Sequence, residues 1–294
     1  MTTLMLILVL NLGAAQAIEV APDQILTVIS AGAGDPVVLL PGLSGCAYGY
    51  RNIVFPLQQD GFRTAIIEPL GIGSSGRPKN ADYTLTAQAD RVAAVMDSLG
   101  MNGAIIVGHG VSTSIALRLA YRRPELVGAV VSIEGGPNET VATPTMENSL
   151  KLASVVAKLG GDGLLRDKFK SGLEKASGDK SWIDRRTVGR YLKNLTDMDD
   201  FIDALQAMAK SNEPESLREN LSRISCPVLL LTGQAPHSGS VSPEEIDTLN
   251  EGLSGFSVQA VPGAGHFIFE EQPAVVVSAI KSVRASEGKQ SCVP

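Results

Sequence analysis

Residues 105 to 113 read IIVGHGVST, and this stretch decides the fold more clearly than any other part of the chain. An apolar strand runs into a Gly-His-Gly-Val-Ser turn, and a helix rich in small residues begins behind it. The same order of strand, turn and helix forms a nucleophile elbow, whose usual pattern is Gly-x-Ser-x-Gly with a reactive serine at its centre. Here the central residue is Gly110, so the pattern predicts the corner without its reactive side chain.

Short apolar runs alternate with amphipathic helices on both sides of this corner. We expect strands at 25–30, 36–40, 62–67, 104–107, 127–133, 227–232 and 257–261, and helices at 50–59, 85–99, 111–121, 243–252 and 273–284. The first two strands are separated by a Gly-rich stretch, 31–35, which favours a hairpin between them. Fully apolar strands between helices are typical of a parallel sheet covered on both faces. The predicted class is therefore α/β.

Residues 140–222 break this alternation, because they are mostly helical and charged and contain no β-like run. One sheet domain over 18–139 and 223–285, carrying 140–222 as a helical cap, fits this pattern better than two domains in series. The polar residues 286–294 are expected to form a flexible tail.

Composition excludes several classes of function. The chain has 294 residues, of which 44% are hydrophobic and 19% charged, with a net charge of −6. This length suits one large domain. A negative charge without a basic cluster argues against nucleic acid or an anionic membrane as a partner. Three cysteines without a CxxC spacing indicate neither a metal framework nor a disulfide framework. We therefore expect no cofactor and no metal, and a small molecule as the partner.

The N-terminus has features of a secretory signal peptide. An apolar run, Leu4 to Leu12, precedes Ala15-Gln16-Ala17, a small-x-small cleavage pattern, which predicts a signal over 1–17 and a secreted or periplasmic protein. The run is too short to span a bilayer, so no stable membrane anchor is expected once the signal is removed. No Lys or Arg precedes Arg51, however, and an uncleaved or misplaced start is the alternative.

Four stretches fall into one arrangement: LLPGLSG (39–45), EPLGIGSSGRP (68–78), GHGVS (108–112) and PGAGHFIFEEQP (262–273). Together they resemble the α/β-hydrolase superfamily over roughly residues 22–285, in particular its capped esterases, epoxide hydrolases and haloalkane dehalogenases. The second stretch departs from the family pattern only by Glu68, where an aspartate is usual. The resemblance implies an eight-stranded, mostly parallel sheet with helices on both faces and a helical cap inserted after strand six.

The resemblance also implies roles for single residues. The backbone amides of Leu43 and Val111 would form an oxyanion hole, His266 would be the general base, and residue 110 would be the nucleophile. Glycine cannot attack a carbonyl, so the covalent route is closed at Gly110. Ser112 is expected to point along the first helical turn, away from the histidine, and is more readily explained as a small residue at a tight contact.

The family usually has an acidic residue that orients the catalytic histidine, and its position here also departs from the usual pattern. After the strand PVLLLTG (227–233) the family usually offers an aspartate, but this chain has Gln-Ala-Pro-His at 234–237. Some branches, including the haloalkane dehalogenases, place the acid at the end of the sixth strand, where this chain has Glu134. A buried carboxylate needs a partner, and His266 is the natural one. The alternative is a loop glutamate that binds nearby amides before Gly135.

Three other side chains near these motifs have plainer interpretations. His109 precedes the elbow centre, a position where the family commonly carries a histidine for packing. His237 lies in a Ser/Gly/Pro loop and is expected to be solvated. No ligand spacing supports a metal site built from the three histidines. Ser44 is expected to be a turn residue.

Three hypotheses for the function follow. In the first, the chain hydrolyses an ester, lactone or epoxide through His266 and water, since general-base help is typically worth ~10²–10⁴-fold, or through a nucleophile that the motifs do not reveal. Alternatively, it is a non-catalytic descendant of a hydrolase that holds a small apolar ligand beneath its cap, and an unpaired His266 would favour this alternative. Third, Gly110 replaces serine in a variant of a working enzyme. The sequence indicates neither the substrate nor the oligomeric state.

Overall fold

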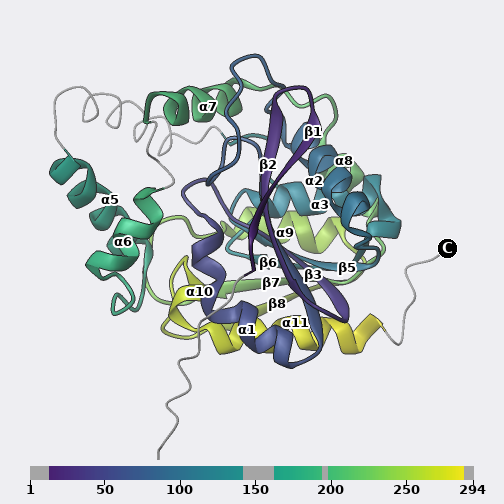
Figure 1. Cartoon of the computed structure of the whole chain (residues 1–294). Helices are drawn as coiled ribbons and strands as arrows, with labels where there is room; N and C mark the ends of the chain where they lie inside the picture. Colours follow the sequence, from purple (N-terminus) through teal and green to yellow (C-terminus); the bar gives the residue numbers. More distant parts are fainter. Residues whose placement is uncertain (1–12, 142–161, 194–197, 288–294) are drawn as a thin grey trace, which may run out of the picture.

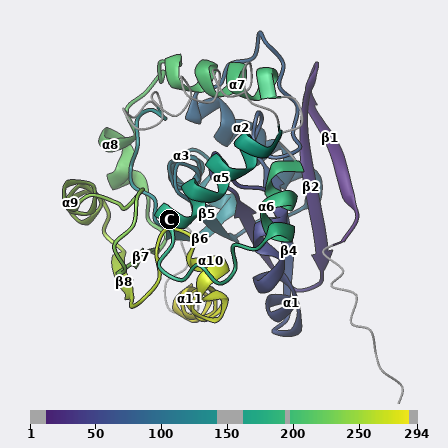
Figure 2. The ribbon, with the colours of Figure 1, turned by 90° about the vertical axis from the view of Figure 1, so that its left-hand side faces the viewer.

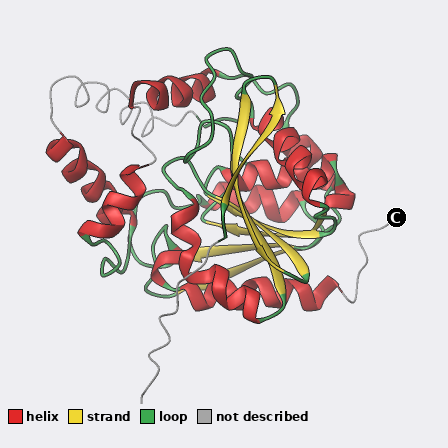
Figure 3. Cartoon of the chain, viewed as in Figure 1, coloured by secondary structure: helices red, strands yellow, loops and turns green. Residues whose placement is uncertain are grey.

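The computed structural model describes residues 13–141, 162–193 and 198–287. One eight-stranded sheet runs through it in the order β1-β2-β4-β3-β5-β6-β7-β8 (Figure 1, Figure 3). Neighbouring strands from β4 to β8 are parallel, whereas β2 is antiparallel to both β1 and β4. The strands are β1 (Ala15–Ala21), β2 (Gln24–Gly32), β3 (Asp35–Leu40), β4 (Phe62–Glu68), β5 (Ala104–His109), β6 (Val127–Ile133), β7 (Val228–Gly233) and β8 (Phe256–Val261). The predicted mostly parallel sheet is confirmed.

Helices cover both faces of the sheet, as predicted (Figure 2). On one face lie α1 (Arg51–Gln59), α10 (Ile268–Glu271) and α11 (Pro273–Glu287). On the other lie α2 (Leu85–Leu99), α3 (Ser112–Arg122) and α9 (Pro243–Gly252). Each face has its own apolar core, because successive side chains of a strand point to opposite sides. Short 3-10 helices occupy Ala47–Tyr50, Pro124–Leu126 and Leu221–Arg223.

Local signals explain where two of these helices begin. Thr84 caps α2 by accepting a hydrogen bond from the amide of Ala87 at 3.1 Å. A capping box begins α9, in which Ser242 and Glu245 each bond the other's backbone and Pro243 stands at the first position. Such caps satisfy amides that have no partner within the helix, which is why both helices begin within a residue of the predicted positions.

The predicted hairpin between the first two apolar runs is wrong. β4 lies between β2 and β3 in the sheet, and the hairpin partner of β2 is β1. Alternation of apolar residues indicates a strand but not its neighbour, so the sequence could not distinguish these pairings. β1 includes Ala15 and Ala17, which pair with Ile29 and Thr27. Cleavage after Ala17 would thus remove three residues of this strand.

Between β6 and β7 lies the helical cap, which confirms the predicted insertion after strand six. Its described helices are α5 (Asp162–Ala176), α6 (Arg185–Leu192), α7 (Met198–Lys210) and α8 (Leu217–Asn220) (Figure 1). Residues 142–161 and 194–197 of the predicted cap lie outside the described residues, as do residues 288–294 of the predicted tail. The first residues of that tail instead continue α11 to Glu287. Among the described residues, no helix is both long and apolar enough to cross a membrane.

A buried arginine ties both ends of the cap to the core. Arg118 of α3 has no exposed side-chain surface, and its guanidinium lies 2.8 Å from Glu139 and 3.3 Å from Glu213. Glu139 follows β6 and Glu213 precedes α8, so one cation joins the segments at which the chain leaves and re-enters the sheet domain. Glu139 also accepts hydrogen bonds from the amides of Leu217 and Arg218, each at 3.0 Å.

We therefore expect Arg118→Met to lower the free energy of unfolding by about 3 kcal/mol, because it leaves the carboxylate of Glu213 buried without its cation. Urea unfolding followed by circular dichroism measures this loss. Arg122→Met, in the same helix, is the matched control: Arg122 is 31% exposed and pairs with Asp90 and Glu215, so its loss should cost less than about 1 kcal/mol. Equal losses in the two variants would contradict the role of Arg118 in joining the two ends of the cap to the sheet domain.

Candidate active site

Tight backbone packing forms the corner between β5 and α3. Gly110 has φ +54°, its amide donates to the carbonyl of Ile133 at 2.9 Å, and its own carbonyl accepts from the amide of Thr113 at 3.0 Å. A Cβ on Gly108 would lie 2.7 Å from the nitrogen of Thr113, and a Cβ on Gly135 would lie 2.0 Å from Thr113 Oγ1. The elbow therefore needs glycine at 108 and 135 for close packing, and its centre has the left-handed backbone expected of this corner.

Gly110 differs from these two glycines in its surroundings. A Cβ built on it would meet only the His266 ring, 3.7 Å from Nε2 and 3.8 Å from Cε1, which is ordinary van der Waals contact. The imidazole thus faces the place where the family carries its nucleophile. There is room for a small side chain, and in its absence room for part of a substrate or a water.

The loop that carries His266 joins β8 to α10 and is held by several elements. The amide of His266 donates to the carbonyl of Ala176, at the end of cap helix α5, at 2.7 Å. The carbonyl of His266 accepts from Nε2 of His109 at 3.2 Å. His109 is 3% exposed and packs against Phe267 and Phe269, which agrees with its predicted packing role. Core and cap together fix the position of the predicted base.

The ring of His266 is neutral at ordinary pH. Burial, and then the neighbouring His237, lowers the pKa of His266 to about 4, and the backbone of Gly239 opposes part of this shift. Its Nδ1 lies beside Gly239 but makes no hydrogen bond of ordinary geometry. A neutral imidazole can accept a proton at Nε2 only when its hydrogen is on Nδ1. The structure therefore permits a base here, and among the residues it describes no carboxylate bonds Nδ1 to hold the required tautomer.

Glu134 follows β6 with its side chain almost wholly buried, 3% exposed as a residue, and with a left-handed φ of +48°. Its carboxylate accepts hydrogen bonds from the amides of Gly233 and Val241 and lies 3.6 Å from Nε2 of His237. Burial raises the pKa of Glu134, and these amides and His237 oppose the shift. Glu134 lies within 4.8 Å of a ring nitrogen of His266 but makes no hydrogen bond to it. Its role as the orienting acid stays a prediction.

The structure gives Ser112 a structural task. Its buried hydroxyl donates to the carbonyl of Pro41 at 2.7 Å, which fastens the start of α3 to the loop after β3. Leu43 and Val111 both line the cavity in front of His266, and among the described residues neither backbone amide has a hydrogen-bond acceptor. Their role as an oxyanion hole stays a prediction, and the geometry leaves both amides available for it.

The cavity itself measures about 350 Å³ and opens between the sheet domain and the first residues of the cap. Gly110, His266 and Glu134 line it, together with the exposed Ser44. Its volume lies in the range of small-molecule sites. The predicted catalytic residues and a ligand-sized space thus occupy one place in the fold.

Comparison with known proteins agrees with this geometry. A family model described as "alpha/beta hydrolase fold" matches residues 35–273. The chain belongs to the α/β-hydrolase family. It is 24% identical over 262 residues to the sn-1-specific diacylglycerol lipase ABHD11 of Mus musculus, covering 85% of this chain and 80% of that one. It is 24% identical over 271 residues to the 2-(acetamidomethylene)succinate hydrolase of Mesorhizobium japonicum, covering 87% and 90%. Among solved structures it resembles the epoxide hydrolase CorEH, with a TM-score of 0.78 and 19% identity over 93% of this chain and 99% of that one.

Sequence reasoning was wrong about one histidine of this α/β-hydrolase. The side chain of His237 is 1% exposed rather than solvated, because its loop folds back against the cap. Ser238 donates from its amide to the carbonyl of Lys175 in α5 at 3.0 Å. A loop of Ser, Gly and Pro gives no signal of such long-range packing, so nothing local could have revealed it.

Two acidic residues of the family motifs hold loops in place through backbone amides. Glu68 is 2% exposed and accepts from the amides of Ala47 and Ser74 at 2.7 and 2.6 Å, which explains how a glutamate serves where the family has an aspartate. Glu271 accepts from the amide of Gly265, next to His266, and from Gly178 and Asp179 of the cap at 2.8–2.9 Å. The acidic-x-Pro pattern predicted an acidic residue at position 271 but not the amides that it binds.

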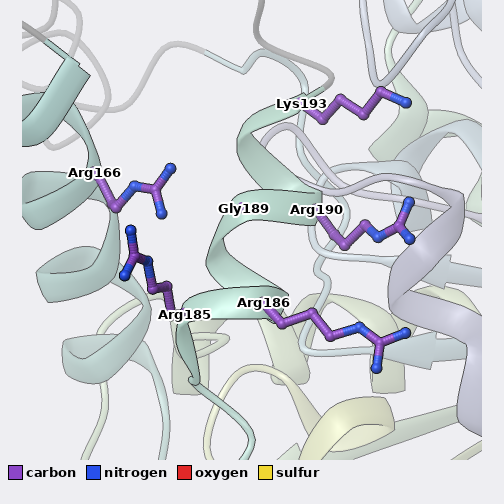
Figure 4. Close-up of a pocket in the computed structure, with 6 residues that line it drawn as sticks. All are labelled: Arg166, Arg185, Arg186, Gly189, Arg190 and Lys193. Carbon is purple, nitrogen blue, oxygen red and sulfur yellow. The ribbon is translucent and has the colours of Figure 1, made fainter.

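The premise that the α/β-hydrolase chain lacks a basic cluster is also wrong. Two cap helices bring five basic side chains to one surface pocket, which Figure 4 shows. They are Arg166 of α5 and Arg185, Arg186, Arg190 and Lys193 of α6 and its end. Four of the five lie within residues 185–193, where the sequence already shows them, and the packing of α5 beside α6 adds Arg166. The pocket is separate from the cavity at Gly110, with which it shares no lining residue.

Proposed function

We propose that this α/β-hydrolase family member hydrolyses a small apolar ester, lactone or epoxide, with His266 activating water directly. One observation carries the proposal: Nε2 of a buried, neutral imidazole faces the position of the missing nucleophile side chain, with 3.7 Å to where a Cβ would stand. A water at that place would lie between the base and a substrate in the cavity. This arrangement needs no covalent intermediate.

The reaction proposed for an ester has two proton transfers. Nε2 of His266 takes a proton from water while the water oxygen attacks the carbonyl carbon, and the resulting oxyanion is stabilised by the amides of Leu43 and Val111. The imidazolium then gives its proton to the leaving alcohol oxygen as the carbon–oxygen bond breaks. General-base help supplies ~10²–10⁴-fold and a single oxyanion donor roughly 10²–10³-fold. Turnover should therefore be slow but measurable.

The relatives support the substrate class. By their names, the two curated relatives are a diacylglycerol lipase and a succinate-derivative hydrolase, and the structural neighbour is an epoxide hydrolase. In each of these reactions, as named, water cleaves a bond of the substrate. The lining of the cavity, which is partly polar around Glu134 and Asn138, does not select one of these substrates.

A second candidate function is binding without chemistry. The observation that favours it is the lack of a hydrogen bond between Glu134 and the His266 ring, whose Nδ1 has no partner among the described residues. A hydrolase descendant that only holds a ligand has no need of this bond. The same cavity of about 350 Å³ would serve as its binding site.

Kinetics on a panel of nitrophenyl esters of short-chain acids, with one lactone and one epoxide, tests the proposal. We expect steady turnover without a pre-steady-state burst of nitrophenol, and no mass increase after incubation with a fluorophosphonate. A burst or an adduct would show a hydroxyl nucleophile that the proposal excludes. No turnover of any substrate in the panel, together with a ligand-induced rise of Tm in a small-molecule screen, would favour binding without chemistry.

Export is a separate proposal, resting on the apolar run and on Ala15-Gln16-Ala17. N-terminal sequencing of the protein purified from its native source is expected to start near Ile18. A chain that retains Ala15–Ala17 would contradict cleavage and would keep the whole of β1, where these residues pair with β2.

A further inference from the structure

We propose that Glu134, His237 and His266 together bind a divalent transition metal ion, with Zn²⁺ as the best match. One ligand atom from each residue lies within 4.8 Å of the other two. The residues come from three separate loops, after β6, β7 and β8, so the fold and not a local motif brings them together. Binding of the ion does not depend on the proposed hydrolysis.

The tautomer of His237 suits a metal ligand. Its Nδ1 donates to the carbonyl of Ala235 at 2.7 Å, so that in the neutral ring the hydrogen is on Nδ1 and Nε2 has a lone pair for a metal. A second ring nitrogen bonded to a backbone carbonyl is the usual support of a metal-binding histidine. Nε2 of the neutral ring and an oxygen of Glu134 are then two acceptors that lie 3.6 Å apart.

Neighbouring hydrogen-bond donors satisfy Nε2 of His237 and the Glu134 oxygen only in part. Ser240 Oγ lies 3.1 Å from Nε2 of His237, but it also lies 3.3 Å from the carbonyl of the same residue and has only one hydrogen to give. A cation between Glu134 and His237 would satisfy both acceptors. Bonds of about 2.0–2.1 Å in a tetrahedron put two ligand atoms roughly 3.4 Å apart, close to the observed 3.6 Å.

His266 supplies the third ligand through the ring edge that faces away from Gly110. Nε2 faces Gly110, whereas Nδ1 lies beside Gly239, where a Cβ would come within 3.1 Å of it. Nδ1 is buried and has no hydrogen-bond partner among the described residues. An unpartnered buried nitrogen carries a desolvation cost, and coordination by a metal would offset it.

The donor set and its support indicate the kind of metal. Two imidazoles and one carboxylate suit Zn²⁺ and related first-row ions, and three protein ligands leave a position for water or a ligand. The amides of Gly233 and Val241 hold the carboxylate of Glu134 in place. The left-handed backbone of Glu134, at φ +48°, is a strained conformation of the kind that functional sites retain.

A consequence for catalysis follows, and this part rests on the proposed function. A neutral imidazole with a metal on Nδ1 carries its hydrogen on Nε2, so His266 could no longer take a proton from water. The metal-bound protein should therefore hydrolyse esters more slowly than the metal-free protein. Metal binding and hydrolysis would compete for the two nitrogens of one ring.

Titration of the full chain, freed of metal by dialysis against EDTA, with Zn²⁺ alone tests binding without any substrate. We expect one site per chain by calorimetry, and Co²⁺ in its place should give the intense visible bands of a four- or five-coordinate ion. Glu134→Gln and His237→Asn should each weaken Zn²⁺ binding at least about 100-fold, since each removes a direct ligand and the loss of an outer-shell partner alone typically costs about 10–100-fold. Glu245→Gln is the matched control, because Glu245 lines the same cavity but bonds Asn138 instead.

Equal Zn²⁺ affinity in the native chain and in both ligand variants would overturn the proposal, as would a weak, octahedral Co²⁺ spectrum. Either result would leave Glu134 and His237 as neighbouring side chains with no metal between them. Thermal unfolding shows whether a variant has folded, and His237→Asn decides the question if Glu134→Gln has not. Tight Zn²⁺ binding without ester hydrolysis would support the site while contradicting the proposed function.

Discussion

Gly110→Ser is expected to raise the rate at which short-chain nitrophenyl esters are hydrolysed by at least about 100-fold over the native chain. Two predicted parts of a serine hydrolase are positioned for this gain: a Cβ at residue 110 would make ordinary contact with Nε2 of His266, 3.7 Å away, and the amides of Leu43 and Val111 have no other acceptor among the described residues. A hydroxyl attached there would lie beside His266 as its base and could form an acyl-enzyme intermediate. In a serine protease the loss of the nucleophile alone costs on the order of 10⁶-fold, so a partial recovery is a modest expectation.

Gly110→Ala is the matched control for this gain. Alanine brings the same Cβ and the same backbone strain at φ +54°, roughly 1–3 kcal/mol, but no hydroxyl. The serine variant should also acquire a burst of nitrophenol and a fluorophosphonate adduct, which the alanine variant should lack. If the two variants react equally slowly, His266 and the amides are not aligned for acyl transfer.

His266→Ala is expected to lower the native ester turnover about 100-fold or more, at the level of kcat rather than KM. The physical reason is that the imidazole acts on the water and not on substrate binding, and general-base help is worth ~10²–10⁴-fold. Steady-state kinetics of the two proteins at one pH measures the loss. Thermal unfolding of the variant accompanies it, because the His266 ring also packs against His109 and Phe267.

Imidazole added to the medium provides the discriminating control. It should restore part of the lost rate, because a small base can enter the space that alanine leaves beside Gly110. A variant that keeps its fold and its full turnover would remove His266 from the mechanism. Loss of turnover without rescue, together with a much lower Tm, would show that the histidine is needed for packing alone.

The fold could be predicted almost completely because its signals are local. The elbow sequence at 105–113 and the helix starts at Thr84 and Ser242 each determine a short segment through neighbours in the chain. The pairing of β2 could not be predicted in this way. Its partners, β1 and β4, are chosen by packing across the sheet, and the alternation of apolar residues is the same for every choice.

The site was predicted in part for the same reason. Glu134 follows the buried strand β6 and His266 follows the edge strand β8 within a motif, so their convergence at one edge of the sheet could be expected, although their roles stay predictions. His237 carries no such signal, because its burial depends on the contact of its loop with α5. The basic surface of the cap was missed although four of its five residues lie within 185–193; only the contribution of Arg166 depends on α5 packing beside α6.

The contrast among the elbow glycines bears on how this chain can change over generations. Positions 108 and 135 cannot accept a side chain without displacing backbone or Thr113, whereas position 110 opens onto nothing closer than the imidazole of His266. A side chain at residue 110 can therefore appear or disappear without displacing its neighbours, unlike one at 108 or 135. A single codon change at this position leaves the packing of the corner intact, so the presence of a side chain at the elbow centre is evolutionarily reversible while positions 108 and 135 stay under selection for packing.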